Sequence, residues 1–454
     1  MTDPRPPQSR RRFLSKLVSG AVAAGATPYM LSATERREAY TLASRTYQSA
    51  NDQVQLAVIG AGGMGMSDVS TALTVPGVKL VAAADCYEGR LTAVKTRHGA
   101  DVFTTRDYRE ILQRDDIDAV IVGTPDHWHQ KISVEALRSG KAVYCEKPMV
   151  HQIEQGAELI RAQNESGKTF MVGSQGMSSL GNEKAKELLE QGAIGELNYA
   201  EGFWARNDPI GAWQYSIPED ESEETVDWDM FLGDAPRRPY DPLRIFRWRN
   251  YRDYGTGVSG DLFVHLFSSL HFVTSSHGPR KIMAQGGLRY WKDGREVPDV
   301  LLGMFDYPET AAHPGFNLSL RVNFVDGTSG TTFLRLVGSE GAMDITWTDV
   351  VLRRNKAVSP TDVFSQMKSD EMDRAAEARK QMLPPAESVY VAENGYKGAH
   401  FDHHMHFFNG VRHGTPVHED AVFGLRAAAP ALACNNSYFG EKVVSWDPEQ
   451  MNVL

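Results

Sequence analysis

A glycine-rich run at residues 60–65, GAGGMG, constrains the fold of this chain more than any other feature. It has the pattern G-x-G-x-x-G and directly follows the apolar run 54–59, which predicts a buried strand. In a strand–turn–helix unit, the first glycine permits the tight turn, the second lets a pyrophosphate approach the backbone, and the third lets helix and strand pack closely. Unpaired N–H groups at the helix N-terminus favour the anion. The predicted cofactor-binding residues of this turn are Gly60, Gly62, Gly63, Met64 and Gly65.

An acidic residue stands where a dinucleotide site requires one. Asp85 lies 20 residues after Gly65, at the end of a second predicted strand, 79–84. Its carboxylate can accept hydrogen bonds from the ribose hydroxyls. The next residue is Cys86, and no Arg or Ser stands there to bind a 2′-phosphate. We therefore expect NAD as the cofactor rather than NADP.

Strands and helices alternate through the first part of the chain, which is typical of a doubly wound parallel α/β sheet. We therefore place a Rossmann domain at residues 53–175. Its further strands are expected at 119–122, 142–145 and 169–172, and its helices at 87–98, 129–139 and 152–166.

The second half predicts an α+β domain, residues 176–454, with a mostly antiparallel sheet. Apolar and polar residues alternate over 318–324, Asp326-Gly327 follows, and a second strand is expected at 331–337. This pattern predicts a hairpin with Asp-Gly as its turn. Residues 359–397 are charged and interrupted by prolines, which indicates an insertion or long loop. Helices are expected at 401–412 and 418–438.

Two polar segments follow strands of the predicted parallel sheet, at the edge where such sheets bind ligands. They are the run TPDHWH at 124–129 and the triplet Glu146-Lys147-Pro148. Further along, Asp261 and His265 form a D-x-x-x-H pair. With the glycine run, these motifs resemble the glucose–fructose oxidoreductase and inositol dehydrogenase family (Gfo/Idh/MocA) over about residues 53–450. The resemblance implies an oxidoreductase that acts on CH–OH groups.

The residue types suit the oxidation of an alcohol, which removes a proton from oxygen and a hydride from carbon. Asp261 and His265 are four residues apart and share one face if their segment is helical. We expect Asp261 to orient His265, His265 to take the hydroxyl proton, and Lys147 to donate to the same oxygen. A surface ion pair is the alternative for the D-x-x-x-H pair. Many family members carry Gly where this chain has Phe263, which puts the local packing in doubt.

Other polar residues complete the expected site. Further cofactor contacts are predicted for Thr124, Pro125, His127, His129, Glu146 and Lys147. The two histidines are expected at the nicotinamide end, with helix capping as their alternative. Predicted substrate contacts are Gln175, Arg247, Arg249 and Tyr254, although an Arg/Tyr run is as often a packed loop. Aromatic residues at 203–204 and 213–215 fit either a platform for a sugar ring or core packing.

The net charge of the chain limits which classes of binding partner are expected. The formal net charge of the 454 residues is −10, and no long basic patch follows residue 16, so nucleic acid is not an expected partner. A small carbohydrate is the expected ligand. His400, His403, His404 and His406 have no carboxylate or cysteine set beyond Asp402, and we expect no metal site. The family resemblance implies a homodimer or homotetramer.

The N-terminus predicts export. Residues 9–14, SRRRFL, resemble a twin-arginine signal, and a mild apolar stretch follows that is too short for a permanent membrane span. We expect a signal peptide at 1–33, a linker at 34–52 and a periplasmic location; a disordered basic tail is the alternative. The twin-arginine route carries folded proteins, so NAD is expected to be tightly held.

Three hypotheses follow. The first is hydride transfer from a ring hydroxyl carbon of a sugar, glycoside or cyclitol to bound NAD. The second is a redox-neutral, NAD-dependent glycoside hydrolase or lyase that oxidises its substrate transiently. The third is a sensor without catalysis, against which the presence of Lys147, Asp261 and His265 argues.

Overall fold

The computed structural model describes residues 29–31, 53–328, 332–355 and 386–454. Of the predicted signal and linker, it describes only strand β1 (Tyr29–Leu31). The twin-arginine run at 9–14 lies outside the described residues, and so does the linker at 34–52.

The N-terminal domain is a six-stranded Rossmann sheet in the order β4-β3-β2-β5-β6-β7, and every pair in it is parallel. This confirms the predicted doubly wound sheet. The strands are β2 (Val54–Ile59), β3 (Val78–Ala84), β4 (Phe103–Thr105), β5 (Ala119–Val122), β6 (Ala142–Cys145) and β7 (Phe170–Val172). The helices are α3 (Gly63–Ala72), α4 (Glu88–His98), α5 (Tyr108–Leu112), α6 (Asp126–Arg138) and α7 (Gly156–Ser166).

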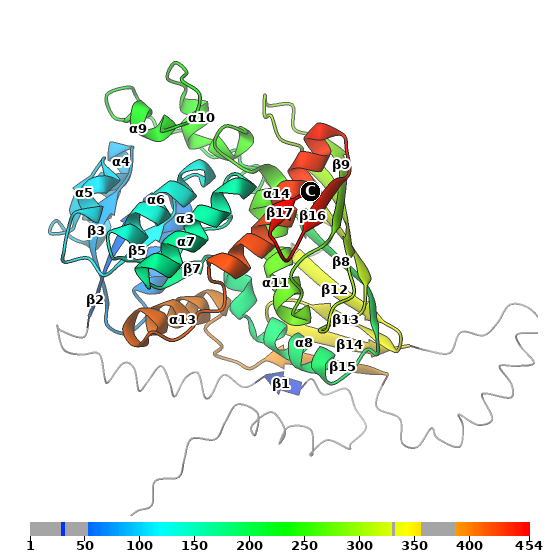
Figure 1. Ribbon diagram of the computed structural model, residues 1–454. Helices are drawn as coiled ribbons and strands as arrows, with labels where there is room; N and C mark the ends of the chain where they lie inside the picture. Colours follow the sequence, from blue (N-terminus) through cyan, green and yellow to red (C-terminus); the bar gives the residue numbers. More distant parts are fainter. Residues whose placement is uncertain (1–28, 32–52, 329–331, 356–385) are drawn as a thin grey trace, which may run out of the picture.

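The C-terminal domain is built on an eleven-stranded sheet in the order β1-β15-β14-β13-β12-β8-β11-β10-β9-β16-β17 (Figure 1). It is mostly antiparallel, as predicted; β1 with β15 and β11 with β8 are its parallel pairs in the described residues. Its strands are β8 (Leu197–Ala205), β9 (Lys281–Gly287), β10 (Val300–Tyr307), β11 (Phe316–Asn323), β12 (Thr332–Gly338), β13 (Gly341–Ile345), β14 (Asp349–Arg354), β15 (Glu387–Ala392), β16 (Val444–Asp447) and β17 (Asn452–Val453). Helices α8 (Leu180–Glu190), α9 (Trp228–Leu232), α10 (Pro242–Phe246) and α11 (Val264–Thr274) belong to the same half of the chain.

The predicted Asp-Gly hairpin is wrong. Both strands form, but β8 lies between them, so Ser319 of β11 and Arg335 of β12 both pair with Glu201. The side chain of Asp326 instead closes a local turn by accepting from the N–H of Thr328 at 2.9 Å. Alternation of apolar and polar residues reports which face of a strand is buried, and it does not identify the neighbouring strand.

Residues 359–397 are expected to form an insertion or long loop, but the C-terminal end of this segment is not a loop. Residues 387–392 form β15, which pairs antiparallel with β14 and parallel with β1. The part at 359–385 lies outside the described residues.

Two late helices return to the Rossmann domain. Helix α13 (Ala399–His413) buries Phe407 and Phe408 in one apolar cluster with β2, and α14 (Ala421–Gly440) passes between the two sheets (Figure 1). The main-chain N–H of Val172, in β7, donates to the main-chain oxygen of Glu419, just before α14, at 2.9 Å. None of the helices in the described ranges is long and apolar enough to cross a membrane.

Candidate active site

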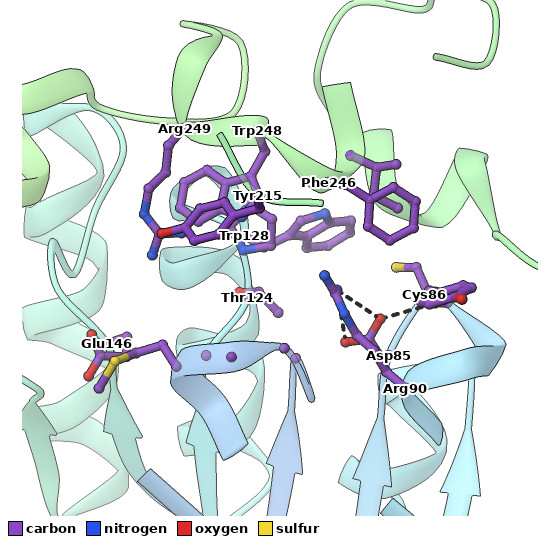
Figure 2. A pocket seen from close by; sticks show the side chains of 18 of the residues that line it. Asp85, Cys86, Arg90, Thr124, Trp128, Glu146, Tyr215, Phe246, Trp248 and Arg249 are labelled. Atoms are coloured by element: carbon purple, nitrogen blue, oxygen red, sulfur yellow. Dashed lines mark hydrogen bonds and ion pairs between the residues drawn. The ribbon is translucent and has the colours of Figure 1, made fainter. Parts of the chain in front are cut away.

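A cavity of about 950 Å³ lies where the Rossmann strands end, and segments of the C-terminal domain cover it. Figure 2 shows Asp85 and Arg90 at one end of the strand edge and Glu146 at the other, with Thr124 between them. Trp128, Tyr215 and Arg249 lie above that edge. The cavity therefore joins the strand ends, where nucleotides bind in such folds, to side chains of the second domain.

The glycine turn forms one wall and fits a dinucleotide. Gly60 has φ +91°, and a Cβ there would lie 2.6 Å from the main-chain carbon of Gly123. A Cβ on Gly65 would lie 2.0 Å from the oxygen of Gly60, so only glycine lets α3 pack this closely against the strand. Gly62, Gly63 and Met64 line the cavity. The backbone is thus bare where a pyrophosphate would meet the N-terminus of α3.

Asp85 lies at the end of β3, as predicted, and has a partner that sequence reasoning missed. Its Oδ1 accepts from the N–H of Tyr87 at 3.0 Å, and both of its carboxylate oxygens lie 3.3 Å from Nη1 of Arg90. Cys86 does follow Asp85 in the sequence, but Arg90 reaches the carboxylate from the next turn of the chain. The carboxylate of Asp85 holds Nη1 of Arg90 in an ion pair and still stands where it can accept from the ribose hydroxyls of NAD.

The histidines predicted to contact the nicotinamide do not line the cavity. His129 bridges two strand-end segments: its Nδ1 lies 2.7 Å from the oxygen of Pro148, and its Nε2 lies 2.8 Å from the oxygen of Thr124. The ring of His127 packs against Phe231, and its Nε2 lies 2.9 Å from that residue's oxygen. Four predicted contacts from these segments do line the cavity: Thr124, Pro125, Glu146 and Lys147. Trp128, which was not predicted, lines it as well.

Lys147 and Asp261 meet across the cavity wall. Lys147 Nζ donates to Asp261 Oδ1 at 2.8 Å and to its main-chain oxygen at 2.9 Å. Arg249 Nε donates to the same Oδ1 at 3.2 Å. Burial opposes ionisation of Asp261, but these two cations outweigh it and hold its pKa well below the usual range. Asp261 is therefore a fixed anion that orients Lys147, rather than His265 as expected.

His265 lies on the same wall but is held differently. Asp261 lies in a π-helical turn (Ser259–Phe263), which α11 continues, so the two residues do not stack as they would on a regular α-helix. The ring of His265 packs on Trp204 with centroids 5.2 Å apart, and its Nδ1 has no hydrogen-bond partner. Burial, followed by the charge of Lys147, lowers its pKa well below 6.5. His265 is neutral at neutral pH and can accept a proton.

Gln175 reaches the cavity from the end of β7 and belongs to a buried polar group. Its Nε2 donates to Glu146 Oε1 at 2.7 Å and lies 3.1 Å from the hydroxyl of Tyr144 and 3.4 Å from Asp68 Oδ1. Burial raises the pKa of Asp68 to about 8 and that of Glu146 well above its usual range. Both acids are therefore largely protonated at neutral pH.

Two of the predicted substrate residues serve the fold. Arg247 donates to the oxygen of Tyr215 at 2.8 Å and does not line the cavity. Tyr254 is fully buried between Phe231 and His127. Gln175 and Arg249 are the predicted substrate residues that do line the cavity.

Aromatic and basic residues complete the wall near His265. Of the aromatic residues considered from the sequence, Trp204, Trp213 and Tyr215 line the cavity, whereas Phe203 stacks on Phe333. Sequence reasoning missed Arg206, Trp347 and His400, which come from distant parts of the chain. The run of aromatic residues at 203–204 was the available clue, since Arg206 lies two residues after Trp204.

The histidines of α13 have separate roles. Nδ1 of His403 lies 2.7 Å from the hydroxyl oxygen of Ser178, and its Nε2 lies 2.7 Å from the main-chain oxygen of Val172. The ring of His404 stacks on Tyr144. His400 faces Trp347 in the cavity wall. In the described part of the chain, no three potential ligands are placed to hold a metal ion.

Two regions match models of one protein family. Residues 54–174 match the Gfo/Idh/MocA model described as the NAD-binding Rossmann fold of an oxidoreductase family, and residues 200–285 match that family's C-terminal alpha/beta domain. Both matches support membership of the Gfo/Idh/MocA family. The N-terminal domain is accordingly an NAD-binding Rossmann fold.

Individual proteins match over shorter segments or at lower identity. An inositol 2-dehydrogenase of Rubrobacter xylanophilus is 33% identical over 35% of this chain and 46% of its own length. A glycosyl hydrolase family 109 protein of a Shewanella species is 29% identical over 43% of this chain and 45% of its own. This chain thus spans less than half the length of the curated relatives it matches. The structure of a levoglucosan dehydrogenase with NADH and levoglucosan shares the fold, with TM-score 0.63 and 18% identity over 87% of this chain and 99% of that one.

Proposed function

We propose that this chain, whose two domains match models of the Gfo/Idh/MocA oxidoreductases, is an NAD-dependent enzyme that oxidises a ring hydroxyl of a sugar, glycoside or cyclitol. One observation carries the proposal: Lys147, Asp261 and His265 line the same cavity as the glycine turn. The relatives named for inositol and levoglucosan support this substrate class.

The residues divide the work on the alcohol. NAD, when bound, supplies the acceptor for the hydride that leaves the carbon. Lys147 spends two of its three N–H donors on Asp261, which leaves one to hold the substrate oxygen. His265 lines the same wall with its Nδ1 unpartnered, and we assign it to take the hydroxyl proton. Asp261 fixes the ammonium of Lys147 and keeps it close to the developing alkoxide.

A redox-neutral glycoside hydrolase or lyase is the second candidate. The relative named as a glycosyl hydrolase family 109 protein favours it. Such an enzyme would use the same oxidation step and then reverse it after the aglycone has left. The two candidates therefore differ in their net products rather than in the residues that begin the reaction.

The setting of the enzyme is also a proposal. The run at 9–14 supports export by the twin-arginine route to the periplasm, with NAD already bound. We further propose a homodimer or homotetramer. Size-exclusion chromatography with light scattering, and localisation of a variant in which Arg10, Arg11 and Arg12 are changed to Lys, would test these two points.

The near-ultraviolet absorbance of reduced nicotinamide tests the proposed function directly. The purified protein is mixed with sugars, cyclitols and aryl glycosides, with and without added NAD. A lasting rise with one compound would establish a dehydrogenase and name its substrate. Release of an aglycone without a lasting rise would establish the redox-neutral cycle. No response to any compound, with NAD shown to be bound, would contradict both candidates.

A further inference from the structure

The end of the cavity that surrounds Lys147 holds more positive than negative charge. Its cations are Lys147, Arg206 and Arg249, and Asp261 is its charged carboxylate. Glu146 does not offset them, because burial raises its pKa well above its usual range. Burial lowers the pKa of His400, so it adds no charge at neutral pH. Three fixed cations thus face one carboxylate.

The single carboxylate is already engaged. Asp261 accepts from Lys147 and from Arg249 through the same oxygen, so its charge is shared between those two groups. The other acidic residues of the cavity wall are Asp85, Glu88 and Asp220. Asp85 engages Arg90, Glu88 opens α4 three residues further on, and Asp220 accepts from the hydroxyl of Tyr87. No acid of the described cavity wall is left to neutralise Arg206.

Arg206 itself is poised for an anion. It follows the last residue of β8, is half-buried, and lies over the ring of Trp204 with its guanidinium carbon 5.7 Å from the ring centroid. One of its five N–H donors reaches the oxygen of Gly211 at 3.2 Å, and no ion pair is found for it among residues 53–328, 332–355 and 386–454. Its charge nevertheless acts on the site, because it lowers the pKa of both Asp261 and His265.

A partly buried cation without a counter-charge costs free energy unless a ligand supplies the charge. We infer that the substrate carries an oxyanion, a carboxylate or a phosphate, which Arg206 binds through its free guanidinium edge beside Trp204. The planar fork of arginine matches either group in a bidentate manner. The aromatic rings of Trp347 and Tyr215 remain for the sugar ring. The inference rests on the proposed function and narrows its substrate class to acidic sugars.

Calorimetric titration of the NAD-loaded full chain tests this inference with two matched pairs of probes. The first pair is D-glucuronate and its methyl ester, and the second is D-glucose 6-phosphate and D-glucose. At least one acid should bind about 10- to 100-fold more tightly than its neutral partner, as expected for a charge-assisted hydrogen bond. A preference within the first pair alone identifies a carboxylate, and one within the second pair alone identifies a phosphate.

Variants tie the preference to one side chain. In Arg206→Gln the preference should fall to less than about 3-fold, whereas Arg206→Lys should keep part of it. The exposed Arg321 stacks on Phe203 outside the cavity, so Arg321→Gln should leave the preference unchanged. Circular dichroism and bound NAD verify that each variant is folded.

The inference is overturned if neutral probes bind as tightly as acids, if neither acid binds, or if the preference survives in Arg206→Gln. Absorbance of reduced nicotinamide, recorded in the same samples, separates this outcome from failure of the proposed function. Reduction of NAD by a neutral sugar without any preference for acids would overturn the inference alone. Tight binding of an acid without turnover of any probe would speak against the proposed function alone.

Discussion

Lys147 Nζ lies 2.8 Å from Asp261 Oδ1, so one buried ammonium links the end of a strand in the Rossmann sheet to a π-helical turn in the C-terminal domain. Asp261 has Arg249 as a second partner. The pair therefore gives the two domains a shared charged contact at the point where the alcohol would react.

Replacing Lys147 by Met should slow reduction of bound NAD about 10²- to 10⁴-fold, because the donor to the developing alkoxide is lost. NAD should stay bound, since the glycine turn is untouched. Single-turnover absorbance measures the rate, and the thermal unfolding temperature shows that the fold persists. Lys131→Met, which removes an exposed ion pair to Asp234, is the matched control and should keep the full rate. An unchanged rate in Lys147→Met would show that Lys147 does not assist the oxidation.

Asp85→Ser should weaken binding of NAD and improve binding of NADP, each by about tenfold or more. The substitution removes the acceptor for the ribose hydroxyls and releases Arg90, which now lies 3.3 Å from both carboxylate oxygens. Fluorescence titration of the two nucleotides measures the change. In the double variant Asp85→Ser, Arg90→Ala the gain for NADP should disappear; its persistence would mean that another residue binds the 2′-phosphate.

Asp68→Asn should stabilise the cofactor-free protein increasingly as pH rises. Burial raises the pKa of Asp68 from 3.8 to about 8, so between these values the folded state keeps a proton that the unfolded chain loses. This difference opposes folding more strongly at each higher pH, up to the folded pKa, and asparagine removes it. The gain in unfolding free energy should grow by about 1 kcal/mol per pH unit between about pH 4 and about pH 8.

Urea unfolding at acidic and mildly alkaline pH measures this gain for Asp68→Asn. Asp101→Asn, at an exposed position, serves as the control and should show no such trend. A difference between Asp68→Asn and the natural chain that does not change with pH would show that Asp68 is ionised in the fold.

His129→Ala should lower the free energy of unfolding by about 2 kcal/mol, because the buried ring packs between the carbonyl oxygens of Thr124 and Pro148 and its single N–H donates to one of them. Since those carbonyls belong to Thr124 and Pro148, the loss should also loosen the neighbouring Lys147 and reduce the rate. Denaturant unfolding and single-turnover absorbance measure the two effects. The half-buried His277, which lies outside the cavity wall, gives a control, His277→Ala, which should alter neither. Weaker binding of NAD by His129→Ala, with an unchanged free energy of unfolding, would instead show that His129 is a cofactor ligand.

The glycine turn and the parallel strands could be predicted because their causes are local. Gly60 and Gly65 are required by backbone geometry within one strand–turn–helix unit, and the strand at 54–59 has the bounds that its apolar run predicts. The family resemblance added Lys147, Asp261 and His265, all of which line the cavity.

The remaining features depend on segments that are distant in the chain. Nothing in residues 318–337 indicates that β8 lies between their two strands. Arg206 lines the cavity because β8 ends beside it, and His400 lines it because α13 begins there. The π-helical turn at Asp261 also has no periodic pattern. The spacing of the D-x-x-x-H pair therefore suggested a regular helix with His265 as the partner of Asp261, whereas Asp261 hydrogen-bonds Lys147.

The return of α14 to the Rossmann sheet has a consequence for how the protein is made. Leu425 packs against Gly156, and Gly424 packs against Val172, so the nucleotide domain lacks part of its apolar cover until residue 425 has been synthesised. At about 5–20 residues per second, a ribosome takes roughly 10 to 50 s to travel from residue 172 to residue 425. During that interval the emerging N-terminal half exposes apolar surface to chaperones. The complete apolar cover of the nucleotide domain therefore belongs to the finished chain, not to the nascent one.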